Sequence, residues 1–135
     1  MIPKFRGRFV EAFSEEEWKY GYLIEDEGYS FIINQVIEAN EQYITIGSWC
    51  PVNPDTLGQS TGLVDKNGKE IFEGDIVKMS KDVYSEPTYY EVVRYRGGAY
   101  RLESKQHGCE LWLRNTDCEI VGNVYENREL LENKE

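Results

Sequence analysis

The sequence contains few cysteines, and the pattern they form excludes several classes of protein. There are only three, an odd number, and none forms a close CxxC pair: Cys50, Cys109 and Cys118. No apolar N-terminal stretch resembles a signal peptide, so we expect reduced thiols and a cytoplasmic location. No apolar run approaches the roughly 20 residues of a membrane-spanning helix, so we expect no membrane partner.

Alanine is also scarce, which weakens any prediction of helices. Tyr, Val, Ile and Trp instead recur in short runs broken by Gly and Asn. Because β-branched and aromatic residues favour strands, the composition predicts a mainly β protein. The 18 aromatic residues (ten Tyr, five Phe and three Trp) in 135 residues indicate a folded chain with a real core.

Basic residues are outnumbered, 15 against 25 acidic residues, for a formal net charge of −10. Proteins bind nucleic acid or anionic membranes largely through Lys and Arg, so this balance disfavours both partners unless a local basic patch exists. Two clusters of basic residues are candidates for such a patch: Lys4, Arg6 and Arg8, and further along the chain Arg94, Arg96 and Arg101.

The chain length fits one domain or two very small ones. Residues 51–59 combine two prolines with Asn, Asp and Gly, the composition of an irregular connection. We therefore divide the chain into residues 1–60 and residues 61–135, which could still form one integrated domain. In the first part, residues 18–24 and 29–33 flank a Glu-Asp-Glu-Gly turn and predict a β-hairpin, and residues 44–49 predict another strand.

The second part shows a stronger hairpin signal. Asn67-Gly68 lies between two apolar segments, which predicts a type I′ turn. Further strands are expected at residues 76–79, 89–95, 100–102, 110–113 and 119–124. Several short strands in so small a region can bury their apolar faces by closing into a small barrel. We expect Ile76, Val77, Val92 or Val93, Leu111 or Leu113, Val121 and Val124 to point inward.

Two motifs in this half resemble the YopX family. The stretch from Thr61 to Val77 reads TGLVDKNGKEIFEGDIV, and the stretch from Ile120 to Leu131 reads IVGNVYENRELL. The beginning of the chain is similar to the family's first residues only as far as Arg6. The resemblance implies a phage or prophage origin, an SH3-like C-terminal barrel and self-association, but no catalytic residue and no cofactor.

The residues of these motifs also have plain structural interpretations. Glycine permits the turn and bend positions, and Ile76 and Val77 enter the core. Asn127 is expected to cap a short terminal turn that holds Leu130 and Leu131. The motif residues that we assign a structural role are Gly62, Asn67, Gly68, Gly74, Asp75, Gly122 and Asn123.

Catalytic and metal-binding patterns are weak. A zinc site would combine the three cysteines with His107, whose spacing to Cys109 is too short for an ordinary zinc knuckle. A hydrolase would pair His107 with Cys109 or Cys118, but no third residue orients the histidine. We expect most of the cysteines to be buried apolar side chains, no metal site and no enzymatic activity, with a hydrolase as a distant alternative.

Two binding hypotheses remain. The first is a non-enzymatic protein that binds another macromolecule of the host or phage and forms homo-oligomers. We expect aromatic residues of the first part at the contact, with Trp18, Tyr20 and Tyr22 as the candidates and Tyr29 and Phe31 in the same aromatic set. The second is a small barrel that binds nucleic acid by stacking and by cationic contacts. Its candidate residues are Tyr90, Arg94, Arg96, Tyr100 and Arg101, although the two arginines at 94 and 96 also suit surface pairing with carboxylates.

Overall fold

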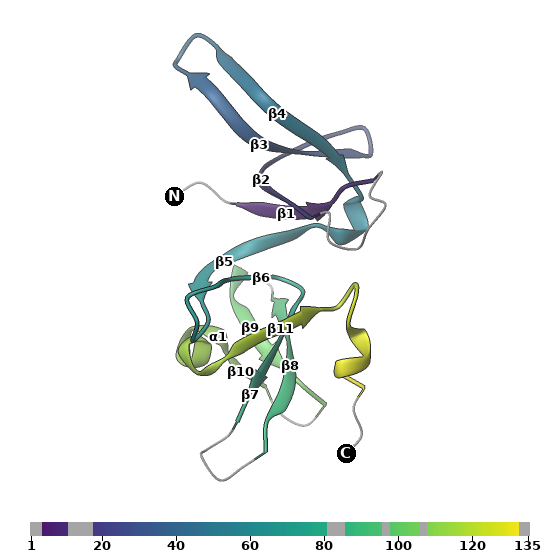
Figure 1. The fold of residues 1–135 in the computed structure, drawn as a ribbon, viewed down its shortest axis with the longest axis vertical. Helices are drawn as coiled ribbons and strands as arrows, with labels where there is room; N and C mark the ends of the chain where they lie inside the picture. Colours follow the sequence, from purple (N-terminus) through teal and green to yellow (C-terminus); the bar gives the residue numbers. More distant parts are fainter. Residues whose placement is uncertain (1–3, 11–17, 81–85, 96–97, 106–107, 133–135) are drawn as a thin grey trace. The chain divides into compact units, whose positions relative to one another are not determined.

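The computed structural model of the chain describes residues 4–10, 18–80, 86–95, 98–105 and 108–132. These residues form two antiparallel sheets with little helix, so the prediction of a mainly β protein is confirmed (Figure 1). The chain divides into two compact units, Met1–Gln59 and Ser60–Glu135. This division falls beside residue 60, where the sequence places its boundary.

The first unit is a meander of long strands with the spatial order β4-β3-β2-β1-β5. Its elements are β1 (Phe5–Arg8), β2 (Trp18–Asp26), β3 (Tyr29–Ala39), β4 (Ile44–Val52), the 3-10 helix η1 (Pro54–Thr56) and the beginning of β5 (Gly58–Val64). The prediction of an irregular connection at residues 51–59 is wrong, because β4 continues to Val52 and β5 begins at Gly58. Only η1 separates these strands, and the Asn53 side chain caps it by accepting from the Asp55 amide at 3.0 Å.

The β2–β3 hairpin predicted from the sequence is present, but its turn has two residues instead of the four expected. Asp26 pairs with Tyr29, and the intervening Glu27 and Gly28 both have positive φ, 49° and 88°. Positive φ at both central residues is the property of a type I′ turn, whose twist matches that of the strands. The type I′ turn of this protein therefore lies here rather than at Asn67-Gly68.

The interior of the first unit is small. Ile32, Ile33 and Val52 are its buried hydrophobic residues among those described. Strand β1 approaches this interior closely, because a Cβ atom on Gly7 would lie 2.9 Å from two Val52 side-chain atoms. Glycine at position 7 thus lets β1 pack against the end of β4.

The second unit contains the hairpin of β5 with β6 (Glu70–Phe72) and a five-stranded sheet of order β10-β9-β8-β7-β11. The sheet strands are β7 (Asp75–Met79), β8 (Thr88–Arg94), β9 (Tyr100–Glu103), β10 (Gly108–Glu110) and β11 (Glu119–Asn123). The helical turns α1 (Leu111–Arg114) and η3 (Asn115–Asp117) lie between β10 and β11, and η4 (Arg128–Leu130) follows β11. Within the described strands the pairing does not return from β11 to β10, so the observed architecture is a five-stranded antiparallel sheet.

One apolar cluster fills the second unit. Its members come from β6, β7, β8, β9, α1 and the residue before β11: Ile71, Val77, Met79, Tyr90, Val92, Leu102, Leu111 and Cys118. Of the alternatives left open by the sequence, Val92 and Leu111 are buried, whereas Val93 is half-buried and Leu113 is exposed. Ile76 and Val77 are fully buried as predicted, and Val121 and Val124 are half-buried.

Three local predictions in this unit are wrong. The Asn67-Gly68 turn is not type I′, because Gly68 has a φ of 83° but Asn67 does not have a positive φ. The Gly68 amide donates to the Asp65 carbonyl at 3.0 Å, so a type I turn ends in a left-handed glycine. Residues 111–114 form a helical turn instead of a strand. Asn127 precedes η4 without capping it, since its side chain accepts from the Asn123 amide.

Candidate functional site

The first YopX-like motif is organised around a buried carboxylate. Asp65 is only 3% exposed, and its Oδ1 accepts from the amides of Asn67 and Lys69, each at 2.9 Å. Its Oδ2 accepts from the Ile120 amide at 3.0 Å. Burial raises the pKa of this carboxyl, but the three amides outweigh burial and lower the pKa below 3.8. Asp65 therefore joins the β5–β6 turn to β11 as a stable anion.

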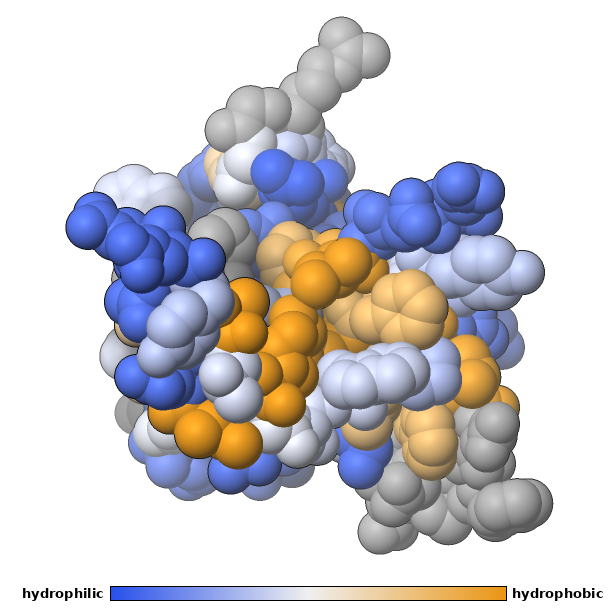
Figure 2. Space-filling view, turned by 90° about the horizontal axis from the view of Figure 1, so that it is seen from above, coloured by the Kyte–Doolittle hydropathy of each residue, from blue (hydrophilic) through white to orange (hydrophobic). Residues whose placement is uncertain are grey.

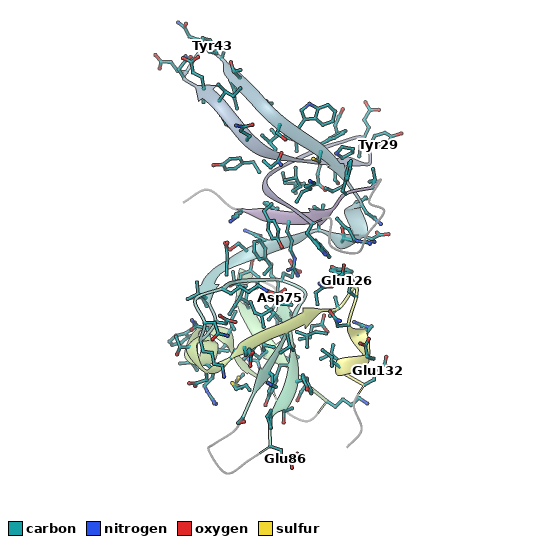
Figure 3. All side chains as sticks on the ribbon, in the orientation of Figure 1. Tyr29, Tyr43, Asp75, Glu86, Glu126 and Glu132 are labelled. Atoms are coloured by element: carbon teal, nitrogen blue, oxygen red, sulfur yellow. The ribbon has the colours of Figure 1, made fainter. Side chains whose placement is uncertain are left out.

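Gly74 and Asp75 hold the next bend of the motif. Gly74 has a φ of 93°, its amide donates to the Val92 carbonyl and its carbonyl accepts from the Val124 amide, both at 2.9 Å. The Asp75 carboxylate accepts from the Phe72 amide at 2.8 Å and is 2% exposed. Figure 3 shows Asp75 among the strands of its unit. These groups fix the entry into β7.

The second motif makes a similar polar turn. Asn123 pairs with Asp75 in the β7–β11 ladder, and its side-chain oxygen accepts from the amides of Tyr125 and Glu126. Its own amide donates to Asn127 Oδ1 at 3.1 Å. A Cβ atom on Gly122 would clash with that Asn127 oxygen, so glycine is needed there. The two motifs meet in space, and their described contacts serve the fold rather than a ligand.

The cysteine chemistry considered from the sequence has little support in the geometry. Cys118 is fully buried, its Sγ lies 3.9 Å from Met79 Sδ, and it donates to the Arg114 carbonyl at 3.3 Å. Burial raises the pKa of its thiol to about 12, so the thiolate needed for metal binding or attack is disfavoured. Burial also raises the pKa of Cys109, and His107 lies outside the described residues. No group of three metal-ligating side chains occurs among the residues that the structure describes.

The tyrosines and arginines considered for nucleic-acid binding are dispersed. Tyr90 is 6% exposed in the core, so its ring is closed to a base. Tyr100 is half-buried, with its hydroxyl 3.5 Å from the Ser60 carbonyl. Arg94 is exposed, and Arg96 lies outside the described residues. Tyr95, the neighbour of Arg94 in the sequence, is 49% exposed and lies outside the core.

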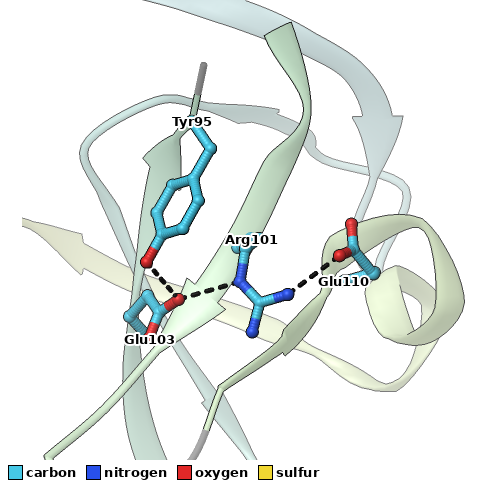
Figure 4. A network of polar contacts seen from close by, with 4 residues as sticks. All are labelled: Tyr95, Arg101, Glu103 and Glu110. Atoms are coloured by element: carbon cyan, nitrogen blue, oxygen red, sulfur yellow. Dashed lines mark hydrogen bonds and ion pairs between the residues drawn. The ribbon is translucent and has the colours of Figure 1, made fainter. Parts of the chain in front are cut away.

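Arg101 is engaged by carboxylates (Figure 4). Its guanidinium donates to Glu103 at 2.9 Å and to Glu110 at 2.8 Å, while the Tyr95 hydroxyl donates to the same Glu103 oxygen at 2.7 Å. The hydrogen bonds from Arg101 and Tyr95 lower the pKa of Glu103. Because Glu103 and Glu110 already neutralise the Arg101 cation, it has little charge left to attract a phosphate. The polar groups of this surface bind one another instead of presenting a free cation to a ligand.

The residues considered for self-association lie on a more open surface. Tyr20 and Tyr22 are 44% and 46% exposed, whereas Trp18 is half-buried and has the Arg6 guanidinium 5.0 Å from its ring centroid. The sheet register places Tyr22 opposite Ile33, and Ile33 opposite Trp49. These exposed rings therefore share one face of the sheet, since cross-strand partners project to the same side.

We define the aromatic face as Tyr20, Tyr22, Ile24, Tyr29, Phe31 and Trp49. Phe31 meets Trp49 edge to face at 5.6 Å, while Tyr29 and Trp49 remain 69% and 58% exposed. The sequence reasoning identified the β2 tyrosines and included Tyr29 and Phe31 in the same aromatic set, but it missed Trp49. The signal that could have found it is the alternation of apolar residues along three adjacent strands.

A second exposed apolar region was missed entirely. Beyond Ile33, strands β3 and β4 continue without β2, and Figure 1 shows them projecting past the other strands of their unit as a two-stranded arm. We call residues 34–48 the hairpin arm. Tyr43 lies at its tip (Figure 3), and Ile37, Ile44 and Ile46 are 66%, 55% and 38% exposed. Figure 2 shows hydrophobic residues reaching the surface on the face seen from above.

Comparison with known proteins agrees with the sequence resemblance. The family model described as YopX protein matches residues 8–132. The structure is similar to a crystal structure of protein EF1440 from Enterococcus faecalis, with a TM-score of 0.64 and 31% identity over 97% of this chain and 99% of the other. It is also similar to a crystal structure of protein YopX from Bacillus subtilis, with a TM-score of 0.55 and 26% identity over the full length of both chains.

No curated protein matches the chain. A search of the described helices for a membrane span finds none that is both long and apolar enough.

Proposed function

The chain belongs to the YopX family, and we propose that it is a non-enzymatic accessory protein of a phage or prophage that associates with copies of itself and binds a further macromolecule. The observation that carries this proposal is the apolar surface of the first unit. Ten of its large hydrophobic side chains are exposed among the described residues: Val10, Tyr20, Tyr22, Ile24, Tyr29, Ile37, Tyr43, Ile44, Ile46 and Trp49.

Patches of exposed apolar surface mark interaction sites on folded proteins. Tyr and Trp are the residues that most often anchor such contacts, because they bury a large area at low entropic cost. An identical subunit is the simplest cover, since one surface then supplies both sides of the contact. The chain's excess of acidic residues suits a protein partner better than a nucleic acid.

The second unit supports the non-enzymatic part of the proposal. The buried carboxylates of Asp65 and Asp75 are used by backbone amides, and the buried thiol of Cys118 is held in its neutral form. We further propose that the β5–β6 hairpin completes the five-stranded sheet as an SH3-like barrel, because Asp65 already links that hairpin to β11. A cytoplasmic location accords with its three free cysteines.

Light scattering on the purified protein tests self-association. We expect a mass that is a multiple of the 15.8 kDa chain. Changing Trp18 and Tyr22 to Ser should reduce that mass, whereas changing the exposed Trp112 of the second unit to Ser should not. A single-chain mass at micromolar protein concentration would contradict the self-association in this proposal.

Binding to immobilised single-stranded DNA and RNA at two salt concentrations tests the alternative that the protein binds nucleic acid. The proposal predicts no salt-dependent retention of the protein. Retention that weakens with salt and is lost when Arg94 is changed to Ala would instead favour a nucleic-acid-binding surface.

A further inference from the structure

Strand β4 is an unusual edge for a β-sheet protein. Among the described strands the sheet edges are β4, β6, β10 and β11. Strands β6 and β10 have three residues each, and β11 has five. Each of these three also carries a glutamate. Short or charged edges discourage pairing with another chain, so these three are protected.

β4 lacks the length and charge protection of the other edges. It is nine residues long and carries no charged side chain, and its ladder with β3 shifts register at Gly47, between Ile46 and Ser48. Within the described part of the chain β3 is its sole strand partner, and the opposite edge is met only at the C-terminal end. There Phe9 bridges Val52, and the Val10 amide donates to the Pro51 carbonyl at 3.2 Å. Among the described residues no strand pairs with this side of β4 from Ile44 to Cys50, so this edge can serve as a template for another strand.

The charge pattern indicates which strand fits this edge. Charged residues make up 30% of the chain, yet none occurs from Gln42 to Pro54, the longest uncharged run in the sequence. A two-fold contact sets each surface against its own copy, so charges near the axis repel their equivalents. In a chain of net charge −10, this segment is where two copies can meet without like-charge repulsion.

The arm itself also requires support. An isolated two-stranded hairpin is only marginally stable in water, and the hairpin arm exposes Ile37, Ile44 and Ile46. Pairing two arms would convert two exposed two-stranded ribbons into one four-stranded sheet. Backbone hydrogen bonds then supply affinity, and the isoleucines of the two copies pack side by side.

We propose that two copies of this chain join through their β4 edges, antiparallel around a two-fold axis near Gly47, to form one continuous sheet. This inference rests on the self-association proposed above and adds the β4 edge as a second contact surface beside the aromatic face. With the axis at Gly47, Ile46 of one copy lies opposite Ser48 of the other. The two Ile46 side chains then become diagonal neighbours on the same face, about 7–8 Å apart.

Charge substitutions on the edge test this arrangement. Ile46→Lys and Ile46→Glu each place like charges near the axis, so each variant alone should show at least a tenfold weaker association by light scattering. An equimolar mixture of the two should recover the wild-type mass, because unlike charges then meet. The control is Leu113→Lys, which places the same charge on an exposed aliphatic side chain of the second unit and should keep the wild-type mass.

Hydrogen exchange measured at increasing protein concentration provides a test without substitutions. The amides of residues 44–50 should become protected as the wild-type protein associates, while those of β10 should not change. If the wild-type protein associates but the Ile46 variants keep its mass and the β4 amides stay unprotected, the β4 contact is wrong and self-association stands. If the wild-type protein has the mass of one chain, both proposals are wrong.

Discussion

The two units of this chain place their hydrophobic residues very differently. Among the described residues, the first unit buries three, Ile32, Ile33 and Val52, and exposes ten large ones. The second unit buries ten and exposes five, namely Val64, Tyr95, Trp112, Leu113 and Tyr125. The second unit thus encloses most of its hydrophobic residues in a core, whereas the first unit leaves most of its hydrophobic residues exposed on the faces and edge of its sheet.

The polar groups show the same contrast. The second unit uses buried Asp65, Asp75 and Asn123 to satisfy backbone amides at its turns. Each such residue joins two segments of the chain. The residues of both YopX motifs therefore have a structural role. The first unit has a thinner interior, so its apolar faces gain most from a partner. The contrast predicts that stability is decided mainly in the second unit and association mainly in the first.

The largest expected effect is the loss of a core side chain from the second unit. Leu102 is completely buried within the apolar cluster, so Leu102→Ala should lower the free energy of unfolding by about 2–5 kcal/mol. The matched change in the hairpin arm, Ile37→Ala, should lower it by less than about 0.5 kcal/mol, since Ile37 is 66% exposed. Urea denaturation of both variants measures the difference, and equal losses would remove the contrast.

The next effect concerns the buried anion of the first motif. Asp65→Ala leaves the amides of Asn67, Lys69 and Ile120 without their acceptor, which should cost about 2–3 kcal/mol of unfolding free energy at neutral pH. Because folding lowers the pKa of Asp65, its stabilisation is complete above the unfolded-state pKa of about 3.8 and is lost as pH falls through the folded-state value.

The stability difference between wild type and Asp65→Ala should therefore shrink on acidification below this range. Denaturation measured from neutral to strongly acidic pH checks the trend. Asp117→Ala is the control, because Asp117 lies on the surface and pairs with Arg114. A difference that stays constant with pH would show that Asp65 does not act through its charge.

A smaller effect is expected at the turn of the β5–β6 hairpin. Gly68 has a φ of 83° and open space around its Cα, so strain rather than a clash opposes a larger residue. Gly68→Val should cost about 1–2 kcal/mol. Asn67→Ala should cost much less, because Asn67 lacks the positive φ that a type I′ turn would impose. Comparable losses of melting temperature for both variants would contradict the observed turn.

The elements predicted best from the sequence are those fixed by local patterns. The β2–β3 hairpin, the strands around Val77 and Val92, and the burial of Ile76 follow from alternation and turn residues. The Asn67-Gly68 turn was misassigned because Asp65 supplies side-chain acceptors that stabilise a longer turn. The helical turn at Leu111 was missed because an apolar triplet fits a short helix as well as a strand.

The candidate site was harder to predict because it depends on contacts between distant residues. The sequence pointed to Tyr20, Tyr22 and Tyr29, but the position of Trp49 on the same face depends on the register of three strands. The involvement of Arg101 with Glu103 and Glu110 likewise requires β9 and β10 to be adjacent. The uncharged run from Gln42 to Pro54 was visible in the sequence, but its importance follows only from the edge position of β4.

The smallest effect should come from the polar network on the second unit. Arg101→Met removes the cation between Glu103 and Glu110 while keeping the apolar stem of the side chain, so only the ionic contribution is lost. Because these groups are partly solvated, the melting temperature should fall by less than it does for Gly68→Val. The fall should also diminish in high salt, where wild-type pairing is screened as well.

The pKa of Glu103, followed by NMR, should rise toward its ordinary value in the variant, since Arg101 is the main cause of its depression. An unchanged Glu103 pKa would show that the network is not maintained in solution. Retained self-association in this variant would place the network outside the contact, which strengthens the division between a self-contained second unit and an interacting first unit.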